Sequence, residues 1–202
     1  MPHARADRAC SRNRLIYLVG PSGSGKDSLL EAARSVLAEQ GIEIARRIIT
    51  RSAESVGEDA LGVSPVQFEQ LRKQGAFAMN WQANGLCYGI ALQIDTWLQQ
   101  GKSVLVNGSR GYLHQARARY PDLLVICLEV APQVLRQRLL ARGREPIEEI
   151  EQRLARNAHL SNAQAAGMKH LDNSGELGAT LRRLLTLLQE EGLIARCPDA
   201  SA

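Results

Sequence analysis

The sequence predicts an α/β protein with a mostly parallel core sheet. Apolar, strand-like runs alternate along the chain with amphipathic, helix-like stretches, which is the order expected of successive βα units. The 202 residues are 45% hydrophobic and 23% charged, ordinary values for one globular domain with a real core. A glycine-rich turn joins the first apolar run to the first amphipathic stretch, as in many phosphate-binding α/β proteins.

Apolar periodicity and helix-terminal residues set the elements of the first half. In chain order these are a strand over 15–19, a helix over 28–40, a strand over 42–49, a helix from 64 to about 75 and a hairpin over about 77–89. Ser64, Pro65 and Gln67 have the pattern of a capping box with proline at the first helical position. The pair Asn84-Gly85 between two strand-like runs predicts the hairpin turn.

The second half continues the same alternation. Its predicted elements are a helix over 91–100, a strand over 102–106, a helix over 112–120, a strand over 123–130, and helices over 132–141, around 147–154 and over 177–191. No internal repeat or low-complexity linker interrupts them. We therefore expect a single domain over residues 14–194, a disordered N-terminal extension over 1–13 and a tail over 195–202.

The net charge of +4 lies mostly at the N-terminus, where four arginines and one aspartate give residues 1–14 a charge of +3. The rest of the chain is close to neutral, which argues against a broad nucleic-acid-binding face. No apolar run is long enough to span a membrane, and residues 1–13 lack the apolar core of a secretory signal. The four cysteines show no metal-ligand or redox spacing, so we expect free thiols and a cytoplasmic protein.

The glycine-rich turn has the spacing of a phosphate-binding loop. It runs Gly20-Pro21-Ser22-Gly23-Ser24-Gly25-Lys26-Asp27-Ser28. Glycines let the backbone approach phosphates, successive N–H groups point inward, and Lys26 reaches the outer phosphates. The sequence therefore predicts the P-loop NTPase fold and a bound nucleoside triphosphate, which we expect to be ATP.

The residue after Lys26 is Asp27, where the general signature has a Ser or Thr whose hydroxyl binds Mg²⁺. A carboxylate is a suitable hard-oxygen ligand for Mg²⁺, and Ser28 could share the role. Without a metal the carboxylate would repel phosphates, so we expect strict Mg²⁺ dependence. The alternative is a first-turn aspartate that only complements the helix dipole.

From Leu15 to about Glu191 the chain resembles the guanylate kinase branch of the P-loop kinases. The matching blocks are the glycine loop, Thr50-Arg51, the hairpin from Trp81 to Tyr88-Gly89, and the arginines from Arg138 through Arg142-Gly143 to Arg153. The resemblance implies a parallel sheet flanked by helices, an acceptor-binding insert over about 46–92 and a helical lid over about 138–156.

The chain departs from the guanylate kinase pattern where that family binds its acceptor. Asn80 stands where a glutamate reads the guanine edge, and Glu54 replaces the second acceptor arginine. Asn107 replaces an acidic residue at the end of a strand. Losing the charged acceptor would leave buried guanine N–H donors poorly paired, which argues against guanylate as substrate.

Several blocks closely resemble the ribose 1,5-bisphosphate phosphokinases of bacterial phosphonate utilisation. They are Gly-Lys-Asp-Ser, Ile49-Thr50-Arg51, the stretch from Trp81 to Gly89, and Asn107-Gly108-Ser109-Arg110. The resemblance implies a small phosphorylated sugar as partner. The γ-phosphoryl group of ATP would pass to the C1 phosphate of ribose 1,5-bisphosphate, giving 5-phosphoribosyl 1-diphosphate (PRPP) and ADP.

This reaction would place charged and polar side chains around the transferring group. The expected catalytic residues are Lys26, Arg138, Arg142 and Arg153, and the expected acceptor-binding residues are Arg51, Asn80, Tyr88, Asn107 and Arg110. The attacking phosphate oxygen is already ionised, so no general base is required. The alternative for the lid arginines is solvated side chains paired with nearby glutamates.

Three other functions remain open from the sequence. One is a guanylate or other nucleoside monophosphate kinase, and one is a kinase for a different phosphorylated sugar. The third is a guanylate-kinase-like interaction module without catalysis, although such modules usually degrade the phosphate loop that is intact here. The sequence does not fix the oligomeric state, and a homodimer is compatible with it.

Overall fold

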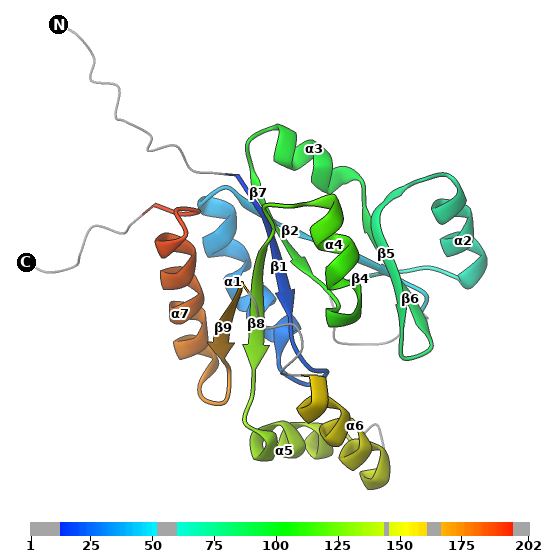
Figure 1. Ribbon diagram of the computed structural model, residues 1–202, viewed down its shortest axis with the longest axis vertical. Coiled ribbons are helices and arrows are strands. Elements are labelled where there is room, and N and C mark those ends of the chain that lie inside the picture. The colour runs from blue at the N-terminus through cyan, green and yellow to red at the C-terminus, as the bar shows by residue number, and fades with distance from the viewer. Residues whose placement is uncertain (1–12, 52–59, 144–145, 161–166, 196–202) are drawn as a thin grey trace, which may run out of the picture.

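The computed structural model describes residues 13–51, 60–143, 146–160 and 167–195; the side chains of Arg153 and of residues 156–160 fall outside that description. A five-stranded sheet in the order β2-β7-β1-β8-β9 forms the centre (Figure 1). Its strands are β1 (Leu15–Val19), β2 (Ile42–Ala45), β7 (Ser103–Asn107), β8 (Leu124–Glu129) and β9 (Met168–Asp172). Every pairing within this sheet is parallel, which confirms the predicted fold class.

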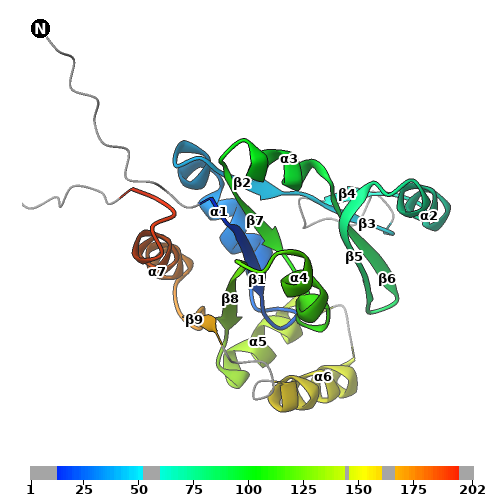
Figure 2. The ribbon, with the colours of Figure 1, turned by 45° about the horizontal axis from the view of Figure 1, so that its top comes forward.

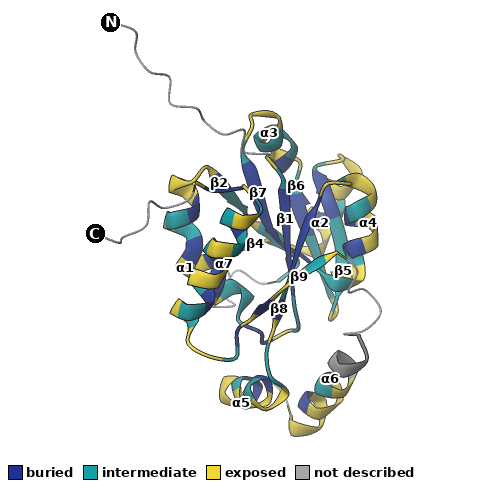
Figure 3. Ribbon diagram, turned by 60° about the vertical axis from the view of Figure 1, so that its left-hand side comes forward, coloured by how far each residue is buried: buried dark blue, intermediate teal, exposed yellow. Residues whose placement is uncertain are grey.

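Helices cover both faces of the core sheet (Figures 1 and 2). They are α1 (Lys26–Glu39) and α7 (Leu177–Glu190) on one face, and α3 (Gln93–Gln99), the 3₁₀ turn η1 (Arg110–Tyr112) and α4 (Leu113–Arg119) on the other. Because alternate strand residues point to opposite faces, Leu18 packs in the first layer and Tyr17 in the second. β1 is buried at every residue, as expected for a central strand covered on both sides (Figure 3).

A second, smaller sheet contains the predicted hairpin. Its order is β4-β3-β6-β5, with β3 (Arg47–Ile49), β4 (Ala60–Gly62), β5 (Phe77–Ala83), β6 (Leu86–Ala91) and the neighbouring helix α2 (Pro65–Lys73). The turn is at Asn84-Gly85, where both residues have positive φ, as a two-residue hairpin turn requires. The capping box between Ser64 and Gln67 is also present, so both local predictions are confirmed.

The prediction of one strand over residues 42–49 is wrong. The run is broken at Arg46, because β2 pairs in parallel with β7 whereas β3 pairs antiparallel with β6 in the other sheet. Apolar residues on both sides of the break made the run look continuous. The break brings Arg47 to the junction of the two sheets, and β4, which pairs with β3, was not predicted.

Two further helices, α5 (Pro132–Arg142) and α6 (Ile147–Leu160), pack on each other beyond the ends of the core strands (Figure 1). They occupy the region predicted to be a lid. The extension predicted over 1–13 lies outside the described residues except for Asn13, and the tail predicted over 195–202 does so except for Ala195. Among the described helices, none combines the length and apolar character needed to cross a bilayer.

Candidate functional site

The P-loop forms one wall of a cavity of about 330 Å³. The other walls come from the start of β3, the β5–β6 hairpin, the loop after β7 and the end of α5. Four basic side chains and one carboxylate line it: Lys26, Arg47, Arg110, Arg142 and Asp27. This charge balance suits a polyanionic ligand such as phosphorylated substrates.

Glycines give the P-loop its shape. Gly23 and Gly25 have φ of 91° and 87°, in the left-handed region that favours glycine. A Cβ atom on Gly25 would lie 2.7 Å from Nδ2 of Asn173, so the tight approach also requires glycine there. Gly25 is the N-cap of α1 and makes no side-chain cap, so the helix start is built from backbone alone, as in anion-binding loops.

Side chains from three separate segments of the chain contact the backbone of the loop. Lys26 Nζ donates to the carbonyls of Gly20 and Pro21 at 2.9 and 3.0 Å. Nδ2 of Asn173, a buried residue after β9, donates to the Ser24 carbonyl at 2.7 Å. Arg138 Nη1 on α5 lies 3.5 Å from the same oxygen, so this predicted lid arginine contacts the P-loop.

Arg47 is a residue of this cavity that the sequence analysis did not select. Its guanidinium donates from Nη2 to Asp27 Oδ1 at 3.0 Å, and only 12% of its side chain is exposed. It also lies over the ring of Tyr88, 5.7 Å from the centroid, and Tyr88 stacks on Trp81. The signal available in the sequence was a pair of arginines, Arg46-Arg47, in the middle of an otherwise apolar run.

Tyr17 fixes the loop that carries Arg110. Its hydroxyl donates to the Ser109 carbonyl at 3.1 Å and accepts from the Ser109 amide at 3.0 Å. Burial raises the pKa of Tyr17, so the hydroxyl stays protonated and remains a donor. Burial also lowers the pKa of Arg110, although a guanidinium remains charged at neutral pH.

The two predicted metal ligands, Asp27 and Ser28, differ in the cavities that they border. Asp27 lines the P-loop cavity and accepts from both Arg47 and Asn107. Ser28 is exposed and lines a second cavity of about 320 Å³, between α1 and β2, which Asp27 also borders. Only Asp27 therefore faces the cavity that contains Lys26.

The structure brings together only some of the predicted acceptor residues. Tyr88 and Arg110 line the P-loop cavity. Arg51 borders a separate pocket at the start of α2, Asn80 lies on β5 away from the cavity lining, and Asn107 borders the second cavity. Arg153 belongs to α6, with its side chain outside the described residues. Trp81, which starts the matching hairpin block, also lines the P-loop cavity.

Parallel pairing also assembles a group that the cysteine spacing could not reveal. Cys127 on β8 lies opposite His170 on β9, and Glu129 Oε1 is 2.6 Å from His170 Nδ1. The ligand atoms of these three side chains lie within 4.8 Å of one another. Sulfur and imidazole favour softer metals than Mg²⁺, so this group differs in chemistry from the Asp27 region.

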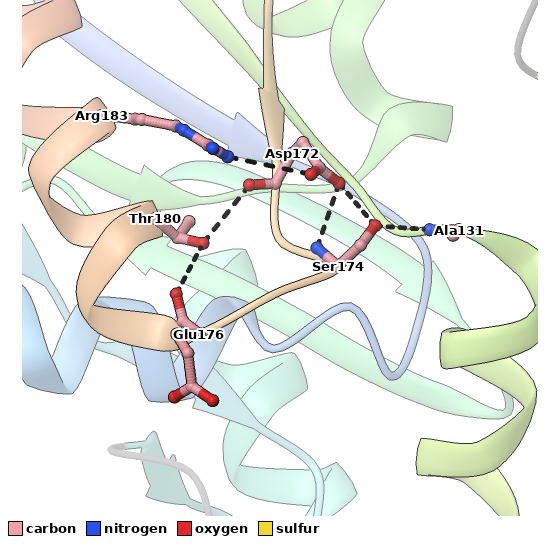
Figure 4. Close-up of polar contacts among 6 residues, drawn as sticks. All are labelled: Ala131, Asp172, Ser174, Glu176, Thr180 and Arg183. Carbon is pink, nitrogen blue, oxygen red and sulfur yellow. Dashed lines mark hydrogen bonds and ion pairs between the residues drawn. The ribbon is translucent and has the colours of Figure 1, made fainter.

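A polar network ties the segment after β9 to the start of α5 (Figure 4). Ser174 Oγ donates to Asp172 Oδ1 at 2.5 Å and accepts from the amide of Ala131, the N-cap of α5, at 2.8 Å. Arg183 Nη1 lies 3.8 Å from the other carboxylate oxygen of Asp172. The network thereby connects the predicted lid to the core sheet.

This network predicts acid-sensitive stability. The hydrogen bond from the Ser174 hydroxyl lowers the pKa of Asp172. A lowered folded-state pKa gives stability that is present above the unfolded value, about 3.9, and is lost as pH falls through the folded value. We expect Asp172→Asn to lower Tm at pH 7, and we expect the Tm difference from wild type to shrink as pH falls below the unfolded value of about 3.9. A Tm difference between Asp172→Asn and wild type that is equal at neutral and acidic pH would contradict this. Ser174→Ala removes the hydrogen-bond donor, so its Tm difference from wild type should also shrink at acidic pH.

Proteins from several bacteria are similar in sequence to this chain over most of its length. No family model matches it. The protein named ribose 1,5-bisphosphate phosphokinase PhnN from Pseudomonas paraeruginosa is 67% identical over 175 residues, which cover 87% of this chain and 95% of that protein. Proteins of the same name are 62% identical in Azotobacter vinelandii, covering 88% and 96%, and 62% identical in Pseudomonas fluorescens, covering 87% and 94%.

Solved structures agree on the fold. Guanylate kinase from Anaplasma phagocytophilum has a TM-score of 0.65 at 18% identity, covering 92% of this chain and 89% of that one. A sugar kinase from Janibacter sp. HTCC2649 has a TM-score of 0.51 at 18% identity, covering 91% and 99%. Sequence identity to the curated relatives extends over most of both chains, and the chain therefore belongs to the ribose 1,5-bisphosphate phosphokinase family.

Proposed function

We propose that this chain is a phosphotransferase that moves the γ-phosphoryl group of ATP to the C1 phosphate of ribose 1,5-bisphosphate. The products are PRPP and ADP. The observation that carries the proposal is the cavity in which the P-loop faces Arg47 and Arg110 across a common space. A donor triphosphate and an acceptor with two phosphates need such a cation-lined site, because both reactants are strongly anionic.

On the donor side, the P-loop backbone would hold the triphosphate. Lys26 would leave the carbonyls of Gly20 and Pro21 and bind the outer phosphate oxygens. Arg142, at the end of α5 and in the cavity lining, would stabilise charge on the transferring group. Arg138 would support the loop through the Ser24 carbonyl.

On the acceptor side, Arg47 and Arg110 offer one guanidinium for each phosphate of the sugar. Tyr88 lines the same cavity, and its hydroxyl would donate a hydrogen bond to a phosphate. An oxygen of the C1 phosphate attacks the γ-phosphorus, the bond to the β-phosphate oxygen breaks, and ADP leaves. The nucleophile is already ionised, so the residues need to position and neutralise charge rather than remove a proton.

A divalent cation fits the residues present. Asp27 supplies a carboxylate within the cavity, and Oδ1 of Asn107 is a buried acceptor with no hydrogen-bond partner among the described residues. Bound Mg²⁺ would neutralise charge on the β- and γ-phosphates.

The free thiols of Cys87 and Cys127 fit a reducing compartment such as the cytoplasm. The domain boundaries and a homodimeric state stay predictions.

The test is Mg²⁺-dependent ADP release from ATP with ribose 1,5-bisphosphate or GMP as the acceptor. We expect turnover with the sugar bisphosphate and none above background with GMP. Arg110→Ala should raise KM for the sugar bisphosphate at least about tenfold, since a hydrogen bond to a charged group contributes about 1.5–3 kcal/mol. KM for ATP should change little.

Arg183→Ala is the matched control, because Arg183 is an exposed arginine on α7 outside the cavity lining. It should leave both KM values unchanged. Preferential turnover of GMP would mean that the nucleoside monophosphate kinase alternative is correct. Nucleotide binding without turnover of either acceptor would favour another phosphorylated sugar as the substrate.

A further inference from the structure

Two positions beside the P-loop carry side chains exchanged relative to the usual P-loop enzyme. Ordinarily a Ser or Thr follows the P-loop lysine and a carboxylate comes from a neighbouring strand, and together they hold Mg²⁺. Here the residue after Lys26 is Asp27, and β7, which lies beside β1, ends at Asn107. The register places Asn107 opposite Leu18, two residues before the P-loop begins.

The two side chains are in direct contact. Asn107 Nδ2 donates to Asp27 Oδ1 at 2.7 Å, and Asn107 is only 2% exposed. The same carboxylate oxygen accepts from Arg47 at 3.0 Å. The pair therefore keeps one carboxylate and one neutral oxygen ligand beside the P-loop, as in the usual enzyme. The carboxylate, however, is on the helix and the neutral ligand is on the strand.

Asn107 Oδ1 provides a separate reason to expect a ligand. It is buried and has no hydrogen-bond partner among the described residues, and a buried acceptor left unsatisfied destabilises the protein. A cation, or a water bound to one, would satisfy it. Ser28 is exposed on the adjoining position of α1 and makes no comparable buried contact in the described part.

We propose that Asp27 and Asn107 form the Mg²⁺ site of the nucleotide complex, with the carboxylate and the neutral oxygen ligand exchanged between helix and strand. Arg47 neutralises Asp27 when the metal is absent, which keeps a carboxylate tolerable beside the P-loop. The inference rests on the proposed ATP-dependent function. It replaces Ser28 by Asn107 as the second residue at the metal.

Exchanging the side chains tests this directly, because Asp and Asn have nearly the same shape. The readout is the Kd of ADP measured by calorimetry with and without Mg²⁺, in wild type, D27N, N107D and D27N/N107D. Wild type should bind ADP more tightly with Mg²⁺. The enhancement is the ratio of the ADP Kd without Mg²⁺ to the Kd with Mg²⁺. In D27N this ratio should fall at least about tenfold. In D27N/N107D most of it should return, because the carboxylate is again on the strand.

N107D alone leaves two carboxylates side by side, so it should weaken ADP binding without Mg²⁺ and increase the enhancement by Mg²⁺. The matched control is Glu31→Gln, which removes a carboxylate one helical turn along α1, at the edge of the second cavity. It should keep the wild-type enhancement. Equal Mg²⁺-free Kd values for wild type and D27N/N107D would verify that the nucleotide site is intact.

Each remaining outcome decides a different claim. If D27N keeps the full enhancement, or if D27N/N107D binds no better than D27N, the exchange is wrong while the kinase function stands. If wild type binds no nucleotide, the proposed function and the exchange fail together. A C127S/H170A variant tests whether the Mg²⁺ effect on ADP binding comes from the group at Cys127 and His170. If this variant keeps the enhancement, that group is not its source. If the variant loses the enhancement, the Asp27–Asn107 site is wrong.

Discussion

Lys26→Ala is expected to lower kcat about 10²- to 10³-fold, the usual cost of removing one positioned donor from a charge-stabilising site. Lys26 lines the cavity and is the P-loop cation that can reach the outer phosphates. In this structure its ammonium group donates to the carbonyls of Gly20 and Pro21, at 2.9 and 3.0 Å. The fold should survive their loss, since each such bond contributes about 1 kcal/mol.

The measurement is steady-state ADP release together with a thermal unfolding curve. Lys73→Ala is the control, because Lys73 is an exposed lysine in the last turn of α2, outside the cavity lining. It should retain wild-type kcat. A Lys26→Ala variant that folds and keeps kcat within a few-fold of wild type would remove the P-loop from the catalytic mechanism.

The P-loop and its flanking elements could be predicted because they are local. The strand, glycines and helix are contiguous, and each has a steric or periodic signal, such as the positive φ that Gly23 and Gly25 adopt. The hairpin turn at Asn84-Gly85 and the capping box at Ser64 follow from the same kind of short-range signal.

The rest of the site depends on contacts between distant segments. Arg47 joins Asp27, twenty positions away, only because the chain leaves one sheet and enters another at Arg46. Apolar periodicity predicts a strand but not which sheet it enters, so Arg47 was missed. The contact between Asn107 and Asp27 was not predicted either, because strand order decides which loops meet at the P-loop.

Gly108→Ala is expected to destabilise the fold by about 3 kcal/mol or more. A Cβ atom at this position would lie 2.1 Å from Cζ of Tyr17, with two further ring carbons at 2.3 and 2.5 Å. Tyr17 is fully buried in the apolar layer, so its ring cannot withdraw without disturbing the packing. Movement of either partner would also strain the two hydrogen bonds between the Tyr17 hydroxyl and Ser109.

The same change should impair acceptor binding, because the loop held by Tyr17 carries Arg110 into the cavity. For a domain of this size, about 3 kcal/mol corresponds to a fall in Tm of roughly 6–12 °C, measurable by circular dichroism. Gly111→Ala tests the loop itself, since a Cβ there would meet nothing nearer than Ser109 Oγ at 3.7 Å. Its Tm should stay within about 2 °C of wild type. If both variants unfold at the wild-type temperature, the contact between Gly108 and Tyr17 does not position the acceptor loop.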